Sequence, residues 1–312
     1  GGAMFASSPI AGAPRPARPG RGFKTGRWHS RVSGHPEALS ELPTVALAEE
    51  IETAGDGQVR ALITIAGNPV LSAPDGARLA DALAGLDFMV SVDPYLNETT
   101  RHADVILPPP PPSGVGHFDV ALSGAVVRNN ARYSPPVLPL PAGRPDECEI
   151  LSRLALFALG MGPDADPQLV DGQVIASALG KEVADPDSPV AGRTVGELTA
   201  MLPDGPGYER RLDMMLRLGP FGDAFGAKPD GLTLQRLKDT PHGVDLGALT
   251  PRIPEILRTP SGKIELAPEP IIADIPRLQA SLDSGDGFLL IGRRPLRSNN
   301  SWMHNLPALC GG

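Results

Sequence analysis

The sequence predicts an α/β fold with a doubly wound, mostly parallel sheet and flanking helices, followed by an irregular helical segment. Three observations carry this prediction. Residues 59–66 form an apolar run that only Arg60 and Thr64 interrupt, as a buried parallel strand requires. After a stretch with helical spacing comes a second run, "DFMVSV" at 87–92, and then a third, "DVIL" at 104–107. Strand, helix, strand, helix, strand in this order is typical of a doubly wound unit.

The neighbouring elements are predicted from spacing and from residues that start or stop helices. Asp75 can cap a helix through 76–85, and Asn97 can cap a short helix before the third strand. The five prolines that follow that strand, Pro108–Pro112, predict an extended polyproline segment. Further helices are expected at 37–56, 147–160, near 168–180, 195–202 and 207–218, and at about 269–280, with a hairpin at 258–266 and a strand at 287–292.

The first 36 residues hold six Lys or Arg and no acid. They are also rich in Pro and Gly, which predicts a basic and mostly irregular surface loop. A loop that contacts an anion is the alternative, and the pattern leaves it open.

Composition restricts the class of protein. The chain has 312 residues, 41% of them apolar, and a net charge of −8. The sign of the charge and the absence of a Lys/Arg stripe argue against a nucleic-acid partner. No apolar run in the sequence approaches the roughly 18 residues that a membrane helix needs. Cys148 and Cys310 are the only cysteines, which excludes a disulfide framework and fits a reduced, cytoplasmic compartment.

Candidate binding residues follow from the predicted sheet. Ligands of such sheets bind beyond the carboxyl ends of the strands, which singles out Gly67-Asn68-Pro69 and Asp93. Asp93 can accept hydrogen bonds from a nucleotide or cap the 95–101 turn, and the pattern leaves both open. Gly292-Arg293-Arg294 is either a phosphate clamp or a solvated basic turn. His102 beside Asp104 is expected to be structural.

Several phrases, in order along the chain, resemble the molybdopterin oxidoreductase superfamily, the dimethyl sulfoxide reductase and formate dehydrogenase group. "ALITIAGNPVLSAPDGARLADALAGLDFMVSVDPYLNETTRHADVILPP" resembles the third domain of that family, and the opening "GGAMF" resembles the loop before it. "TPSGKIEL" and "LLIGRRPLRSNNSWMHN" resemble the hairpin and first strand of the final, molybdopterin-dinucleotide-binding β-barrel domain. The likeness is greatest to formate-dehydrogenase-like members. One departure is the Pro109–Pro112 run, where members commonly carry a polar and acidic stretch.

The resemblance implies roles for particular residues. Gly67, Asn68 and Pro69 would line the guanosine end of a pterin dinucleotide, and Asp93 would accept from the guanine or ribose. Thr99, Thr100 and Asp104 would support that loop. Contacts to pterin or pyrophosphate would come from the barrel side, from Gly292, Arg293, Ser298, Ser301, Trp302 and Met303.

The resemblance also implies the cofactor, the partners and the domain plan. The parent protein would bind bis-molybdopterin guanine dinucleotide with Mo or W, act on a small-molecule substrate and pass electrons to iron–sulfur clusters and an electron-transfer subunit. Its metal ligand and cluster cysteines would lie N-terminal to this chain, so we expect the chain to be an internal fragment that is inert by itself. The expected divisions are 1–57, 58–160, 161–257 and 258–312, the last being the start of the barrel.

Two other hypotheses compete with this one. The first is a non-catalytic scaffold of the same fold, like the large iron–sulfur subunit of respiratory NADH dehydrogenase. Arg293 and "SNNSWMHN" argue against it, because a scaffold does not need residues that contact a pterin. The second is a plain nucleotide-binding module, which a complete Gly-rich phosphate loop would favour, and the sequence has none.

Overall fold

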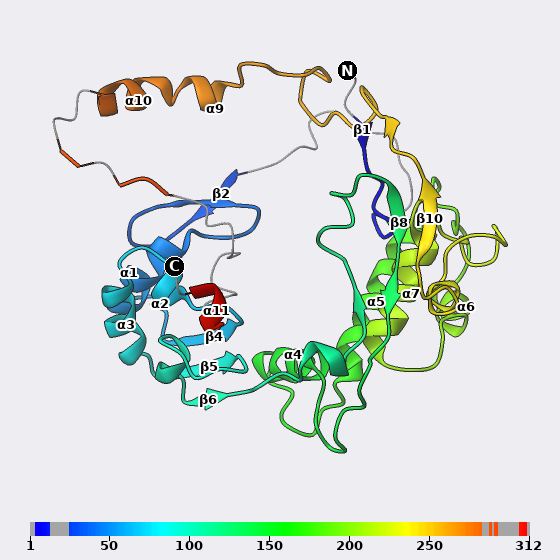
Figure 1. Cartoon of the computed structure of the whole chain (residues 1–312), viewed down its shortest axis with the longest axis horizontal. Coiled ribbons are helices and arrows are strands. Elements are labelled where there is room, and N and C mark those ends of the chain that lie inside the picture. Colours follow the sequence, from blue (N-terminus) through cyan, green and yellow to red (C-terminus); the bar gives the residue numbers. More distant parts are fainter. Residues whose placement is uncertain (1–3, 13–24, 283–286, 289, 293–305, 311–312) are drawn as a thin grey trace. The chain divides into compact units, whose positions relative to one another are not determined.

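The computed structural model describes residues 4–12, 25–282, 287–288, 290–292 and 306–310 (Figure 1). The chain divides into two compact units, Gly1–Lys263 and Ile264–Gly312. The first unit contains the predicted sheet and a set of helices that follow it.

A three-stranded parallel sheet is the centre of the first part of this unit. Its strands are β4 (Ala61–Ile65), β5 (Phe88–Val92) and β6 (Val105–Ile106), in the order β4-β5-β6. β4 and β5 pair without a register shift from Ala61 opposite Phe88 to Ile65 opposite Val92. This confirms a mixed α/β fold with a parallel sheet. The described strands lie side by side in the same order as in the sequence. A doubly wound sheet also contains a reversal of strand order, and that part of the fold stays a prediction.

Helices cover one face of this sheet. They are η1 (Thr44–Ala46), α1 (Leu47–Glu52), α2 (Pro69–Ser72) and α3 (Gly76–Ala84), beside the strands in Figure 1. As expected, the carboxylate of Asp75 accepts from the N–H of Arg78 and caps α3. The core between helices and sheet contains Ala48, Ile51, Leu79, Ala82, Leu83 and Met89. Thr64 and Ser91, side by side on this face, share a hydrogen bond of 2.8 Å.

The opposite face of the sheet is only partly covered: Val90 and Val92 of the central strand are 8% and 2% exposed, whereas the residues around them are more open. Ile63, Ile65, Phe88 and Val105 are 45%, 57%, 48% and 40% exposed. The expectation that residues 59–66 form a strand buried on both faces is therefore wrong for the described residues. The reason is the strand order: parallel crossovers that advance in one direction and share one hand place their connections on the same face.

An N-terminal hairpin packs against α1. It consists of β2 (Thr25–His29) and β3 (Pro36–Ala38), which pair antiparallel. Residues 25–38 are thus not an irregular loop, and the helix expected over 37–56 is confined to 44–52. The strand at 36–38 forms because Glu37 is held from the facing strand by Arg27, through its side chain and its backbone N–H.

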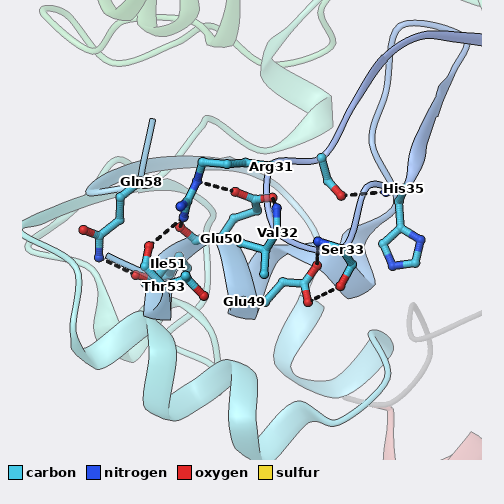
Figure 2. Close-up of polar contacts among 10 residues, drawn as sticks. Arg31, Val32, Ser33, His35, Glu49, Glu50, Ile51, Thr53 and Gln58 are labelled. Carbon is cyan, nitrogen blue, oxygen red and sulfur yellow. Dashed lines mark hydrogen bonds and ion pairs between the residues drawn. The ribbon is translucent and has the colours of Figure 1, made fainter. Parts of the chain in front are cut away.

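Buried acids also fix the turn of this hairpin (Figure 2). The carboxylate of Glu50 accepts from Arg31 Nε at 3.2 Å and from the Val32 N–H at 3.0 Å. Arg31 also donates to the carbonyl of Thr53 at 2.6 Å. Arg27 and Arg31 are therefore neutralised within the chain, which removes these two cations from the anion-contacting alternative.

The rest of the first unit is helical with short strand pairs. Its helices are α4 (Glu147–Ala158), α5 (Gln168–Ala184), α6 (Val195–Ala200), α7 (Gly207–Leu218) and α8 (Leu234–Lys238), and η3 (Pro112–Gly114) precedes them. The helices expected at 147–160, 168–180, 195–202 and 207–218 are confirmed. The paired strands are β1 (Met4–Phe5) with β11 (Thr250–Pro251), β7 (His117–Phe118) with β9 (Tyr133–Ser134), and β8 (Asn129–Ala131) with β10 (Val244–Gly247). These pairings join residues too distant in sequence for a local pattern to predict.

The second unit contains α9 (Glu269–Ile272), α10 (Ile275–Leu282) and α11 (Pro307–Cys310). α9 and α10 occupy the segment where one helix was expected. Gly262 forms the turn expected at 258–266, with φ +66°, but no strand flanks it. Residues 287, 288 and 290–292 are irregular, so the strand expected there does not form among the described residues. The barrel start stays a prediction.

None of the helices in the described part of the chain is both long and apolar enough to cross a membrane.

Candidate functional site: the carboxyl edge of the parallel sheet

The loop after β4 turns sharply at the carboxyl edge of the sheet. Ala66 and Gly67 both have positive φ, +55° and +76°. The Ala66 N–H still donates to the carbonyl of Val92 at 2.9 Å, which extends the β4–β5 ladder into the loop. A side chain added at Gly67 would meet open space, so only the backbone conformation calls for glycine there. The turn therefore presents backbone to the solvent at the position where ligands of such sheets bind.

Asp93 directly follows β5 and is 7% exposed. One carboxylate oxygen accepts from the Tyr95 N–H at 2.8 Å. The other has a long contact of 3.4 Å with the Asn97 amide nitrogen. Asp93 thus caps its own turn, one of the two roles left open by the sequence. Its second oxygen keeps capacity for a further donor, because an ionised carboxylate accepts up to about four hydrogen bonds.

Asn97 and Thr100 close this turn. The side-chain oxygen of Asn97 accepts from the N–H groups of Thr99 and Thr100, each at 2.9 Å, and so caps the turn that leads into η2 (Thr100–His102). The Thr100 hydroxyl donates to the Tyr95 carbonyl at 2.8 Å. Thr99 and Thr100 are buried, and their hydroxyl groups form hydrogen bonds within these loops.

Asn68 joins the loops that follow β4 and β5. Its amide nitrogen donates to Glu98 at 2.7 Å, and its amide oxygen accepts from the Thr99 hydroxyl at 2.7 Å. That hydroxyl in turn accepts from the N–H of Val70, next to Pro69 at the start of α2. The Asn68 hydrogen bond lowers the pKa of Glu98 from its usual value. Glu98 was not among the residues predicted for the site, although its place in the polar run "NETT" after a strand end was a signal.

Asp104 lies at the other end of β5 from Asp93. Its carboxylate accepts from the N–H of Met89 at 2.7 Å, and its own N–H donates to the Met89 carbonyl at 2.9 Å. Met89 to Val92 is three residues, about 10 Å along a strand. The expectation that Asp104 supports the loop after β5 is therefore corrected, because Asp104 joins the start of β6 to the start of β5.

The remaining expected site residues belong to the second unit or fall outside the described residues. Gly292 is an irregular residue of the second unit. Arg293, Ser298, Ser301, Trp302 and Met303 lie outside the described residues.

A pocket of about 180 Å³ lies elsewhere, among residues of α4, α5 and the start of α7. Its carboxylates are engaged: Asp146 caps α4, and Asp171 pairs with Arg211 at 3.2 Å. Burial raises the pKa of Cys148 to about 11 and that of Tyr208 to about 12, so both stay protonated at neutral pH. No group of three or more His, Cys, Asp or Glu suited to a metal ion occurs among the described residues.

The carboxyl edge is suited to binding. Asp93 and the neighbouring Glu98 make it negative, and Asp93 keeps acceptor capacity, which favours a ligand that presents N–H and O–H donors. A purine base and a ribose present such groups. The carboxyl edge of a parallel α/β sheet is the position at which ligands of such folds bind.

Comparison with known proteins identifies the domain. Residues 11–110 match the model of the molybdopterin oxidoreductase family, so this segment is a molybdopterin oxidoreductase domain. The superfamily relationship predicted from the sequence is confirmed, over this segment.

Two relatives show the same relationship. The chain is 39% identical over 70 residues to the assimilatory nitrate reductase catalytic subunit of Bacillus subtilis (strain 168), covering 22% of this chain and 10% of that protein. It is 38% identical over 64 residues to the F420-dependent formate dehydrogenase subunit alpha of Methanocaldococcus jannaschii, covering 20% and 9%. The chain thus spans about a tenth of the length of the curated relatives it matches.

Proposed function

We propose that this chain is part of a formate-dehydrogenase-like, molybdopterin-dependent oxidoreductase and that it helps to bind bis-molybdopterin guanine dinucleotide. The observation that carries the proposal is the acceptor-rich edge formed by the 66–70 and 93–100 loops, inside the segment that matches the family. Both relatives are oxidoreductase subunits by name, and one is a formate dehydrogenase subunit.

The residues at this edge fit the guanosine end of that cofactor. Asp93 has a carboxylate oxygen with only a long contact of 3.4 Å, and guanine has adjacent N–H donors that an acceptor of this kind can bind. The Ala66–Gly67 turn leaves space for a close approach of the base or ribose. Asp104 is not part of the proposed site, because its carboxylate is used at the other end of β5.

The other proposed contacts come from the second unit. Gly292, Arg293, Ser298, Ser301, Trp302 and Met303 would bind pterin or pyrophosphate, a task that suits a guanidinium. When bound, the cofactor supplies two-electron chemistry at Mo or W, and iron–sulfur clusters and an electron-transfer subunit of the parent protein would carry the electrons away. In this proposal the chain binds and orients the cofactor, and is inert alone, because the metal ligand lies outside it.

GMP is the simplest probe of the proposed edge. We expect the chain to bind GMP, and Asp93→Asn to weaken that affinity roughly ten-fold by replacing a charged acceptor. Asp104→Asn is the matched control. It replaces a carboxylate that contacts the opposite end of β5, so it should leave the affinity for GMP unchanged. Titration followed by NMR measures both. Equal affinities for Asp93→Asn and the unmodified chain would refute the role of Asp93.

Cofactor content tests the parent enzyme. Mo, W, Fe and released guanine nucleotide would be quantified in this chain and in the longest natural product that contains it. We expect metal and guanine nucleotide in the longer product. We also expect the longer product, but not this chain, to reduce a dye when formate is added. A longer product without Mo, W or nucleotide would replace the catalytic proposal with the scaffold alternative.

A further inference from the structure

The side-chain amide of Asn68 is held at both ends by two consecutive residues of the neighbouring loop. Glu98 accepts from its nitrogen and Thr99 donates to its oxygen, each at 2.7 Å. These contacts cross 30 and 31 residues of sequence. The carboxylate of Glu98 can only accept, and the Thr99 hydroxyl already accepts from Val70 N–H at 3.1 Å. Only one orientation of the amide satisfies both partners.

This arrangement changes the role expected for Asn68. Both ends of its amide are occupied within the protein, so the side chain faces the neighbouring loop. The part of the 66–70 loop left to face a ligand is the turn of Ala66 and Gly67, which directly precedes Asn68. The position of that turn depends on the strand β4 that precedes it and on the hydrogen bonds of Glu98 and Thr99 to Asn68, which follows it. These two hydrogen bonds are called the clamp on Asn68.

Resting on the proposed function, we propose that Glu98 is a positioning residue: together with Thr99 it holds Asn68 and thereby fixes the Ala66–Gly67 turn against the guanosine end of the dinucleotide. Glu98 itself touches Asn68 and not the ligand. Thr99 is the second half of the clamp, and its burial keeps the hydroxyl from solvent. The lowered pKa of Glu98 is consistent with a carboxylate that stays ionised at neutral pH and remains an acceptor for Asn68.

The test compares two substitutions at Glu98 by their affinity for GMP. Glu98→Ala removes the acceptor, whereas Glu98→Gln keeps a carbonyl oxygen that can accept from Asn68. We expect Glu98→Ala to weaken GMP binding roughly five-fold and Glu98→Gln to stay within about two-fold of the unmodified chain. Thr99→Val removes the hydroxyl that donates to Asn68, and Thr99→Ser keeps a hydroxyl there. We expect Thr99→Val to weaken GMP binding as Glu98→Ala does, and Thr99→Ser to change it as little as Glu98→Gln does. Thermal unfolding shows that each variant compared is folded.

A measurement without ligand separates this inference from the proposed function. In amide NMR spectra of the free chain, Glu98→Ala should shift the Asn68 side-chain signals and the backbone signals of Ala66 and Gly67, and Glu98→Gln should restore them. If those backbone signals do not move, the positioning role is overturned whatever GMP does. If they move but the unmodified chain does not bind GMP, the clamp stands as a positioning device and the nucleotide-binding proposal fails.

Discussion

Glu37 is a buried carboxylate whose charge is stabilised from the opposite strand. Arg27 contacts both of its oxygens, and the N–H groups of Arg27 and Ser40 add further hydrogen bonds. These contacts, the Arg27 side chain first, lower the pKa of Glu37 from 4.5 to about 2. A carboxylate with a lowered folded pKa stabilises the fold above its unfolded pKa and loses that contribution as the pH falls through the folded value.

We therefore expect the hairpin to lose stability between pH of about 4.5 and about 2. Glu37→Gln should lower the unfolding temperature at pH 7, and the difference from the unmodified chain should shrink toward pH 2. Thermal unfolding across this range measures both. Glu41→Gln is the control, because Glu41 is exposed and lies three residues after the end of β3. A pH-independent difference for Glu37→Gln would contradict the assignment.

At the scale of single elements, each end of β5 is contacted by an aspartate, and the two aspartates have different tasks. Asp93 caps the turn at the carboxyl end, and Asp104 ties β6 to the amino end. Asp104→Ala should lower the free energy of unfolding by about 1 kcal/mol, because it removes a hydrogen bond to the Met89 N–H. Asp104→Asn should cost less, since its carbonyl can still accept. Denaturant unfolding gives these values, and no loss for Asp104→Ala would show that the contact adds nothing.

Elements with a local signal were predictable. The helix α3, which Asp75 caps, lies where a capping residue indicated it. The helix α4 and the strands β4 and β5 also lie where capping residues and apolar runs indicated them. The hairpin of β2 and β3 was not predictable, because it depends on Glu37 and Glu50 reaching basic residues 10 to 19 positions away. Composition alone marked that stretch as a basic loop. The clamp on Asn68 was missed for the same reason, since it joins loops 30 residues apart.

At the scale of the molecule, we expect the exposed part of the sheet face, formed by Ile63, Ile65 and Phe88, to affect the behaviour of the chain in solution. Parallel sheets are usually covered on both faces, and large exposed apolar patches promote association. We expect the chain to bind a hydrophobic dye such as ANS and to self-associate as its concentration rises. The double variant Ile63→Thr/Ile65→Thr should reduce both, because it makes the exposed face polar and retains β-branched residues.

Leu62→Thr is the matched control for that experiment. Leu62 lies on the same strand but packs toward α1 and α3. Its substitution should lower the unfolding temperature and leave the dye signal of the folded chain unchanged. Equal dye binding by the double variant and the unmodified chain would show that the exposed sheet face is not the source of the signal.

The candidate site was predictable only in part at this scale. The rule that ligands bind at the carboxyl edge singled out Gly67, Asn68 and Asp93 as candidates, because that rule depends on strand order alone. The family resemblance placed Asp104 with the same loop, and "ADVIL" gives no indication of which end of β5 that aspartate meets. The prediction for Arg293 through Met303 falls outside the described residues and stays a prediction.

The left-handed backbone of Ala66 has one more consequence. An alanine at φ +55° costs about 1 kcal/mol relative to a glycine in the same conformation. Ala66→Gly should relieve that strain and raise the free energy of unfolding, yet it also widens the range of conformations open to the turn in the folded chain. The natural residue thus exchanges stability for preorganisation. If Ala66→Gly raises the free energy of unfolding and lowers the affinity for GMP, the Ala66 methyl group costs stability and favours binding.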